Sequence, residues 1–162
     1  MIRHVLPPTS QQLEAARRVI ADHLVPTPTV LLSLRGRPTY AKLEGLQPTG
    51  AFKVRGALAA VDASKRSDPN GAVITSSAGN HGLGIAYASE ALGVRATVVV
   101  PKNASVAKVK KLKKFDIELI EFGSSYDDAQ EHALELAEAR SINYISPFND
   151  TNVIAGLSLI HI

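Results

Sequence analysis

One lysine in this sequence has local surroundings that favour covalent chemistry. Lys53 lies within the run Gly50-Ala51-Phe52-Lys53-Val54-Arg55-Gly56, which predicts a helix start behind a glycine turn. The positive end of the helix dipole and the charge of Arg55 both favour the neutral amine over the ammonium ion. A neutral amine can form an imine with an aldehyde cofactor. An ordinary helix N-terminus without a chemical role is the alternative.

A second stretch with chemical potential lies about one helix and one strand later. It reads Ser76-Ser77-Ala78-Gly79-Asn80-His81-Gly82, after an apolar run at 72–75 and before apolar residues at helical spacing. This order predicts a strand, a loop of small residues and a helix. Such a loop exposes backbone N–H groups at a helix start, where a carboxylate or phosphate can bind. A tight turn that needs glycine only for packing is the alternative.

Predicted helices and strands alternate along the chain around these two stretches. Helices are predicted at 9–24, 52–64, 80–92, 105–114 and 125–140, and strands at 30–34, 39–43, 72–75, 95–100, 116–120 and 142–145. A turn is predicted at 35–38. Strands that alternate with helices predict an α/β fold with an open, mostly parallel twisted sheet flanked by helices. Ligands are then expected at the carboxyl edge of the sheet.

The composition is that of a globular protein and excludes several kinds of site. Of 162 residues, 45% are hydrophobic and 20% charged, and none is cysteine. Disulfides and cysteine-ligated metals are therefore excluded, and no histidines have metal-ligand spacing, so no metal is expected. No apolar run approaches 18 residues, so no membrane span is expected. Residues 1–8 lack the apolar core of a signal peptide, which predicts a cytoplasmic location.

The positive charge has a structural interpretation. The net charge is +3 and the pI is about 9.3. The one cluster of basic residues contains Lys108, Lys110, Lys111, Lys113 and Lys114. Apolar residues recur between these lysines at helical spacing, which predicts the solvated face of an amphipathic helix and no nucleic-acid partner. No Gly-x-Gly-x-x-Gly follows a strand, which argues against a nicotinamide cofactor.

Together, the two stretches resemble the fold-type II pyridoxal phosphate-dependent enzymes, and most closely the threonine/serine dehydratase (threonine ammonia-lyase) family. The family pattern is a lysine within Ser/Ala-Phe-Lys-x-Arg-Gly, followed about one βα unit later by Ser-x-Gly-Asn-His. The runs at 42–50 and 153–156 also look like the family. The resemblance covers roughly residues 12–156, about half of a typical member. It implies the N-terminal half of the tryptophan synthase β-like fold.

The resemblance implies pyridoxal 5'-phosphate as the cofactor and a role for three residues. Lys53 is expected to hold the cofactor and, once displaced by a substrate amine, to take the proton from the substrate Cα. Phe52 is expected beside the cofactor, with a core aromatic as the alternative. Asn80 is expected to hydrogen-bond the phenolic oxygen of the cofactor, with helix capping as the alternative.

The resemblance also places the substrate carboxylate against the second stretch, chiefly at backbone N–H groups. The residues expected to surround it are Ser76, Ser77, Ala78, Gly79, Asn80 and His81. A partly buried structural histidine is the alternative for His81. Racemases of this family carry a serine at the position of Ala78, and that serine returns a proton to Cα from the opposite face. The methyl group of Ala78 therefore favours a dehydratase.

The implied function is an enzyme that converts threonine, serine or another β-hydroxy amino acid to a 2-oxo acid and ammonia, as a homo-oligomer. A racemase or another β-eliminating lyase is one alternative, and a non-enzymatic amino-acid or cofactor-binding module is another. In the family, the glycine-rich loop for the cofactor phosphate and the polar residue facing the pyridine nitrogen lie downstream. No Gly-Gly-Gly run occurs here. We therefore expect this chain alone to bind the cofactor weakly and to be poorly active.

The expected organisation has four parts. Residues 1–50 belong partly to a large domain, residues 51–145 form a small α/β domain with both stretches, and residues 146–156 begin the return to the large domain. Residues 157–162 read Leu-Ser-Leu-Ile-His-Ile, where the family continues with Gln-Gly-Thr. One reverse translation of these six residues matches the transposon end used in sequencing-library adapters, so we expect a non-native tail. Apolar residues from 153 to 160 are expected to lack a packing surface.

Overall fold

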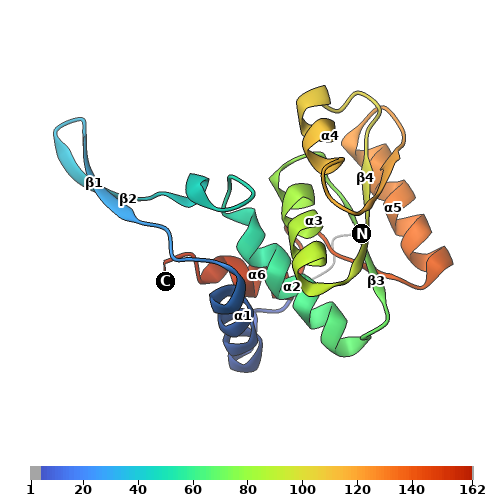
Figure 1. Cartoon of the computed structure of the whole chain (residues 1–162), viewed down its shortest axis with the longest axis horizontal. Coiled ribbons are helices and arrows are strands. Elements are labelled where there is room, and N and C mark those ends of the chain that lie inside the picture. Colours follow the sequence, from blue (N-terminus) through green and yellow to red (C-terminus); the bar gives the residue numbers. More distant parts are fainter. Residues whose placement is uncertain (1–4, 162) are drawn as a thin grey trace.

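The computed structural model describes residues 5–161, which form two separate sheets and the helices around them (Figure 1). The expectations for residues 1–4 and 162 lie outside this range. The strands are β1 (Thr29–Leu34), β2 (Arg37–Lys42), β3 (Ala72–Ser76), β4 (Arg95–Val100), β5 (Glu118–Glu121) and β6 (Asn143–Tyr144). The helices are α1 (Ser10–His23), η1 (Glu44–Leu46, a 3-10 helix), α2 (Lys53–Ser67), α3 (Asn80–Leu92), α4 (Val106–Leu112), α5 (Tyr126–Arg140) and α6 (Thr151–Ser158). The predicted alternation is confirmed, although α4 and β6 are shorter than expected and α2 is longer.

The main sheet is parallel and is covered on both faces. Its strand order is β5-β4-β3-β6, with all three pairings parallel. Side chains alternate across the sheet, so Val73 packs with α2 and α3 on one face while Ile74 packs with α5 on the other. The predicted open α/β architecture is therefore confirmed, and the carboxyl end of β3 delivers the second stretch to the edge of the sheet.

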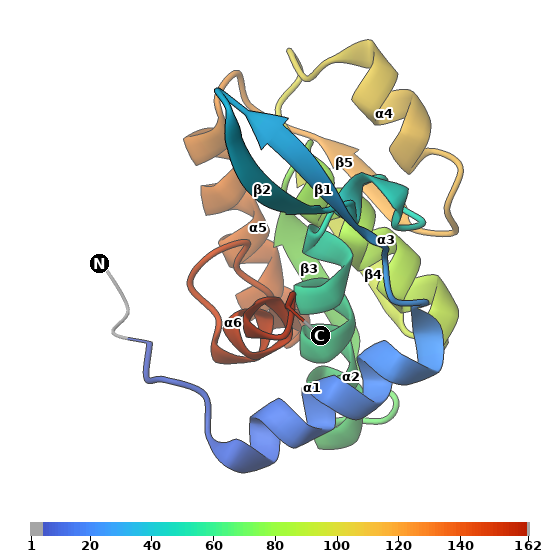
Figure 2. The same cartoon turned by 90° about the vertical axis from the view of Figure 1, so that its left-hand side faces the viewer.

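Helix α2 packs against both α1 and α6, and α1 and α6 also contact each other (Figure 2). A Cβ atom at Gly56 would lie 2.8 Å from the carbonyl oxygen of Val153, and one at Gly156 would overlap the carbonyl oxygen of Arg55. The two glycines therefore allow α2 and α6 to pack almost backbone to backbone. Val153 is fully buried in this contact. The expectation that the apolar residues from 153 to 160 lack a packing surface is wrong for Val153, because α2 itself provides that surface.

Strands β1 and β2 form an antiparallel hairpin that projects from the rest of the chain (Figure 1). The predicted four-residue turn contains two residues, Arg35 and Gly36, with φ values of 51° and 74°. Positive φ at both positions is typical of a type I′ turn, which matches the twist of a hairpin. Pro38 therefore lies within β2, where an edge strand tolerates its missing N–H. Within residues 5–161, no helix has both the length and the apolar character to cross a membrane.

Candidate active site

Lys53 is the first residue of α2, and its side chain reaches a distant backbone carbonyl. Its Nζ donates a hydrogen bond of 2.9 Å to the carbonyl oxygen of Pro147, in the loop between β6 and α6. The same Nζ lies 5.7 Å from the centre of the Phe52 ring. Among the described residues, no carboxylate forms an ion pair with Lys53. The amine is thus half-buried and held by a neutral acceptor.

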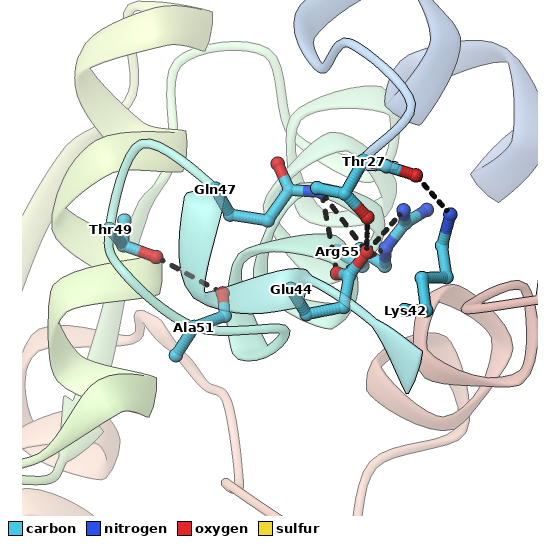
Figure 3. A network of polar contacts seen from close by, with 7 residues as sticks. All are labelled: Thr27, Lys42, Glu44, Gln47, Thr49, Ala51 and Arg55. Atoms are coloured by element: carbon cyan, nitrogen blue, oxygen red, sulfur yellow. Dashed lines mark hydrogen bonds and ion pairs between the residues drawn. The ribbon is translucent and has the colours of Figure 1, made fainter. Parts of the chain in front are cut away.

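Arg55 faces Glu44 in a buried network that sequence reasoning missed (Figure 3). The guanidinium donates to both oxygens of Glu44, at 2.8 and 2.9 Å, and the Thr27 hydroxyl donates to Glu44 at 2.6 Å. Burial opposes the charge of Glu44, but the hydrogen bonds from Arg55 and Thr27 outweigh it and lower the pKa of Glu44 to about 2. Glu44 thus compensates the Arg55 charge. The prediction for Lys53 was made without this compensating carboxylate.

The second stretch forms a tight loop between β3 and α3. The N-cap of α3 is Gly79, and the helix start has no hydrogen bond from a capping side chain. The Ser77 hydroxyl accepts a hydrogen bond of 3.2 Å from the Gly79 N–H, and a Cβ at Gly82 would overlap the Ser77 carbonyl oxygen. Helices α1, α5 and α6 each have a capping side chain. The first-turn N–H groups of α3 remain available to an external acceptor.

Two of the alternative structural roles are wrong. Asn80 is the first residue of α3 and its exposed side chain makes no capping hydrogen bond, so it is not a helix-capping asparagine. Phe52 is 41% exposed, so it is not a core aromatic. Ala78 is half-buried and packs beside α3 and α4. The exposed amide and ring are accessible to a ligand.

His81 lies beneath the loop and is only 3% exposed. Burial lowers its pKa to about 4, and the nearby charge of Lys53 acts in the same direction. Neither ring nitrogen makes a hydrogen bond of ordinary geometry to a described residue, although the Ile145 backbone is close enough to oppose the shift. His81 is therefore a neutral imidazole at neutral pH, as expected for a structural histidine.

The two stretches meet where α3 packs on α2. A Cβ at Gly84 would lie 3.3 Å from the carbonyl oxygen of Lys53 and 3.0 Å from the Cβ of Ala57. The start of α2 and the first turns of α3 are therefore adjacent, with Lys53 near His81. The structure thus brings together the amine and the loop that the sequence singled out.

Three hydroxyl-bearing residues gather at the carboxyl edge of the sheet. Ser76 ends β3, Tyr126 begins α5 and Tyr144 ends β6, and the two strand ends face α5. Burial and then the neighbouring Tyr126 raise the pKa of Tyr144, and burial raises that of Tyr126. Ser76 is fully buried and its hydroxyl has no described partner of ordinary geometry. The second stretch contains Ser76, but nothing in the sequence signalled the tyrosines.

Groups of three or more His, Asp and Glu side chains that could hold a metal ion are absent from residues 5–161. The carbonyl of Pro147 was also missed, because a backbone acceptor has no sequence signature. The arrangement offers an amine, neutral N–H donors and an uncharged imidazole at one edge of a parallel sheet. These groups suit an anionic substrate and a carbonyl that reacts with an amine.

Comparisons with known proteins agree with this geometry. The family described as "Pyridoxal-phosphate dependent enzyme" matches residues 20–160. The L-threonine ammonia-lyase of Thermotoga maritima is 38% identical over 128 residues, which are 79% of this chain and 32% of that protein. The processed form of threonine deaminase isoform 2 from Solanum lycopersicum is 33% identical with a TM-score of 0.82, over 96% of this chain and 46% of that one.

A pyridoxal 5'-phosphate-dependent aspartate racemase is 33% identical with a TM-score of 0.86, over 98% of this chain and 52% of that one. The chain therefore spans about half the length of these solved structures and about a third of the curated relative. The family match extends over most of the chain, from the last turn of α1 through α6. The chain belongs to the family of pyridoxal-phosphate dependent enzymes.

Proposed function

We propose that the protein is a pyridoxal phosphate-dependent ammonia-lyase that converts L-threonine or L-serine to a 2-oxo acid and ammonia. One observation carries the proposal: the Lys53 amine, hydrogen-bonded to a neutral carbonyl, lies near His81 in the uncapped first turn of α3. The similarity to an L-threonine ammonia-lyase supports the reaction class.

The described residues fit part of this cofactor and its substrate. Lys53 supplies an amine without a competing carboxylate, and the centre of the exposed Phe52 ring lies 5.7 Å from it. Asn80 presents an exposed amide at the start of α3. The first turn of α3 supplies neutral donors for a carboxylate. A glycine-rich phosphate loop is not found among the described residues. The fit therefore covers the reactive aldehyde and the substrate carboxylate, and not the phosphate.

Each residue then has a distinct task. The loop N–H groups hold the substrate carboxylate, which orients the Cα–H bond. The buried His81 imidazole is neutral, so the carboxylate is held by neutral donors alone. When bound, the cofactor supplies the electron sink that stabilises negative charge at Cα. The freed Lys53 amine takes the Cα proton as a general base. The β-hydroxyl then leaves with a proton as water, and water hydrolyses the remaining imine, so that the products are the 2-oxo acid and ammonia.

Reductive labelling tests the role of Lys53. Pyridoxal 5'-phosphate and cyanoborohydride are added to the chain, and the modified peptides are identified by mass spectrometry. The label is expected on the peptide that contains Lys53, and Lys53→Ala should remove it. Label on Lys42 or Lys102 in place of Lys53 would reject the assignment.

Racemisation is the second candidate, favoured by the fold match to an aspartate racemase. By the resemblance, a racemase needs a hydroxyl where this chain has Ala78, and a methyl group cannot donate a proton. Ammonia release from L-threonine should therefore be faster than racemisation, and Ala78→Ser should raise the racemised share. If the unmodified protein racemises faster than it releases ammonia, the lyase assignment fails.

The division at residues 50 and 145 also remains a proposal. It is supported by the separation of the β1–β2 hairpin from the four-stranded sheet, which is built from residues 72–144. The homo-oligomer, the cytoplasmic location and the non-native tail stay predictions.

A further inference from the structure

We propose that Glu44 is a positioning residue for the Lys53 amine, acting through its buried ion pair with Arg55. The pair closes residues 45–54 into a loop and thereby fixes the first turn of α2. The inference rests on the proposed function of Lys53, because it concerns the placement of that amine.

The pair is built to hold one geometry. The side chains of Arg55 and Glu44 are 3% and 9% exposed, and their contact is bidentate. Thr27 donates to one Glu44 oxygen, and the Gln47 amide donates to both, at 3.3 and 3.4 Å (Figure 3). Both carboxylate oxygens are therefore occupied from several directions. A bidentate contact of this kind fixes orientation as well as distance.

Residues 45–54, between Glu44 and Arg55, form a series of turns without a side-chain contact of their own that joins its two ends. The N–H of Gln47 donates to the carbonyl of Glu44, and the N–H of Gly50 donates to the carbonyl of Gln47 at 2.7 Å. Gly50 has a φ of 74°, and the start of α2 has no hydrogen bond from a capping side chain. The Arg55–Glu44 pair joins the two ends of this series. It thus provides the side-chain anchor that the helix start otherwise lacks.

Two close backbone contacts limit the movement of the first turn of α2. Gly156 approaches the carbonyl of Arg55, and Gly84 approaches the carbonyl of Lys53, each closely enough that a Cβ would meet it. Lys53 and Arg55 are two residues apart on the same turn. A displacement of Arg55 would therefore displace Lys53 and the 2.9 Å contact of its amine with Pro147.

Positioning and electrostatics predict opposite results when Glu44 loses its charge. An uncompensated Arg55 near Lys53 would by Coulomb's law favour the neutral amine and accelerate its reaction with an aldehyde. A loss of position would slow the reaction. The sign of the change in the Glu44→Gln variant therefore distinguishes the two roles.

The experiment measures the rate of reductive labelling of Lys53 by pyridoxal 5'-phosphate and cyanoborohydride, with exposed Lys102 as the internal reference. Glu44→Gln is expected to slow labelling of Lys53 at least ~10-fold, about 1.4 kcal/mol in the barrier, and to leave Lys102 unchanged. The matched control is Asp62→Asn, which breaks the exposed Asp62–Arg66 ion pair of 2.9 Å in the same helix. This control should leave both rates unchanged.

A double variant, Glu44→Met with Arg55→Met, separates positioning from stability. Replacing a whole buried ion pair by apolar side chains can preserve stability, whereas removing one partner does not. The double variant should recover the urea midpoint of the unmodified protein and still label Lys53 slowly. Recovery of both would overturn the inference, as would unchanged or faster labelling in Glu44→Gln. If the unmodified protein does not label at Lys53, the proposed function fails, and this inference with it.

Discussion

Lys53 and His81, two neighbouring basic side chains of the site, differ in how deeply they are buried. Lys53 is half-buried and has a carbonyl acceptor, whereas His81 is nearly fully buried and has no hydrogen-bond partner of ordinary geometry among the described residues. A charged group without a partner is costly to bury, so the imidazole stays neutral. His81 therefore serves as a buried, uncharged packing residue of the site, and the proposed chemistry is assigned to Lys53.

The pH dependence of stability tests the state of His81. An unfolded histidine titrates near pH 6.5, whereas the pKa of His81 in the folded protein is about 4. Between these values the unfolded chain binds a proton that the folded protein does not, so stability falls as the pH decreases from about 6.5 to about 4. The expected loss between pH 7 and pH 5 is about 2 kcal/mol.

Urea unfolding of the unmodified protein and of His81→Gln at both pH values measures this loss. The variant should lack most of it. The carboxylates of Glu44, Glu118 and Asp128 have lowered pKa values in the folded protein. Their stabilising effect is therefore lost only when the pH falls below the pKa of an unfolded carboxylate, which is about 4. An equal pH dependence in the two proteins would show that His81 is protonated when folded.

At the scale of elements, glycines decide how closely the backbones of the site approach one another. Gly82 accommodates the Ser77 carbonyl within the loop, Gly84 brings α3 onto α2, and Gly56 with Gly156 brings α6 onto α2. Interiors are close-packed, so an added methyl group at such a position forces a backbone to move. Close backbone contacts at these glycines thus help to hold the start of α2 and the loop before α3, in addition to the Arg55–Glu44 pair.

Two alanine substitutions in the same loop test this. A Cβ at Gly82 would overlap the Ser77 carbonyl, whereas a Cβ at Gly79 would lie 3.8 Å from its nearest neighbour, the Ser77 hydroxyl. Gly82→Ala should lower the free energy of unfolding by about 2 kcal/mol, and Gly79→Ala by less than about 1 kcal/mol. Urea titration of both variants measures the difference. Equal losses would mean that the loop can rearrange around the new methyl group.

At the scale of the whole molecule, α6 ties the late part of the chain to its beginning. The Gln12 amide donates to Asn152 at 3.3 Å, and the Thr151 hydroxyl donates to the carbonyl of Leu6 at 3.4 Å. Val153 completes the core formed by α1, α2 and α3. Helix α6 is therefore part of the described fold, and the loop before it supplies the acceptor for Lys53.

Truncation of Val153 measures how much α6 contributes. Val153→Ala removes two buried methyl groups and leaves a cavity, so the free energy of unfolding should fall by about 2 kcal/mol. The matched control is Ile154→Ala. Ile154 is the half-buried neighbour of Val153 on the same helix, so its truncation should lower the free energy of unfolding less. Chemical denaturation monitored by circular dichroism gives both values. A smaller loss at Val153 than at Ile154 would place α6 differently on α2.

Cofactor titration tests whether this chain suffices for tight binding. The described residues offer an amine and loop N–H groups but no glycine-rich run for a phosphate, so we expect weaker binding than in the longer Thermotoga maritima relative. The visible absorbance of protein-bound pyridoxal phosphate is followed in both proteins at matched concentrations. Stoichiometric binding with turnover of L-threonine by this chain would show that its residues already form the phosphate site.

Local signals account for the part of the fold that the sequence predicted. Apolar spacing and glycine turns define the strand–loop–helix unit around the second stretch, and the helix at 80–92 was predicted with its observed bounds. Helix α6 was missed, because eight residues of mixed apolar character give too short a periodic pattern. The two-residue turn at Arg35 was also missed, since a positive φ at a residue other than glycine is uncommon.

The α/β class, the family resemblance and the two stretches that carry Lys53 and the loop could be predicted from the sequence, because they depend on residue order over short distances. The contacts between distant residues became visible only in the folded chain. Lys53 and Pro147 are 94 residues apart in the sequence, yet they form a hydrogen bond. Arg55 pairs with the Glu44 carboxylate, 11 residues earlier, which the sequence did not indicate. Burial decided the rest, because a side chain's charge and exposure depend on neighbours that the sequence does not place.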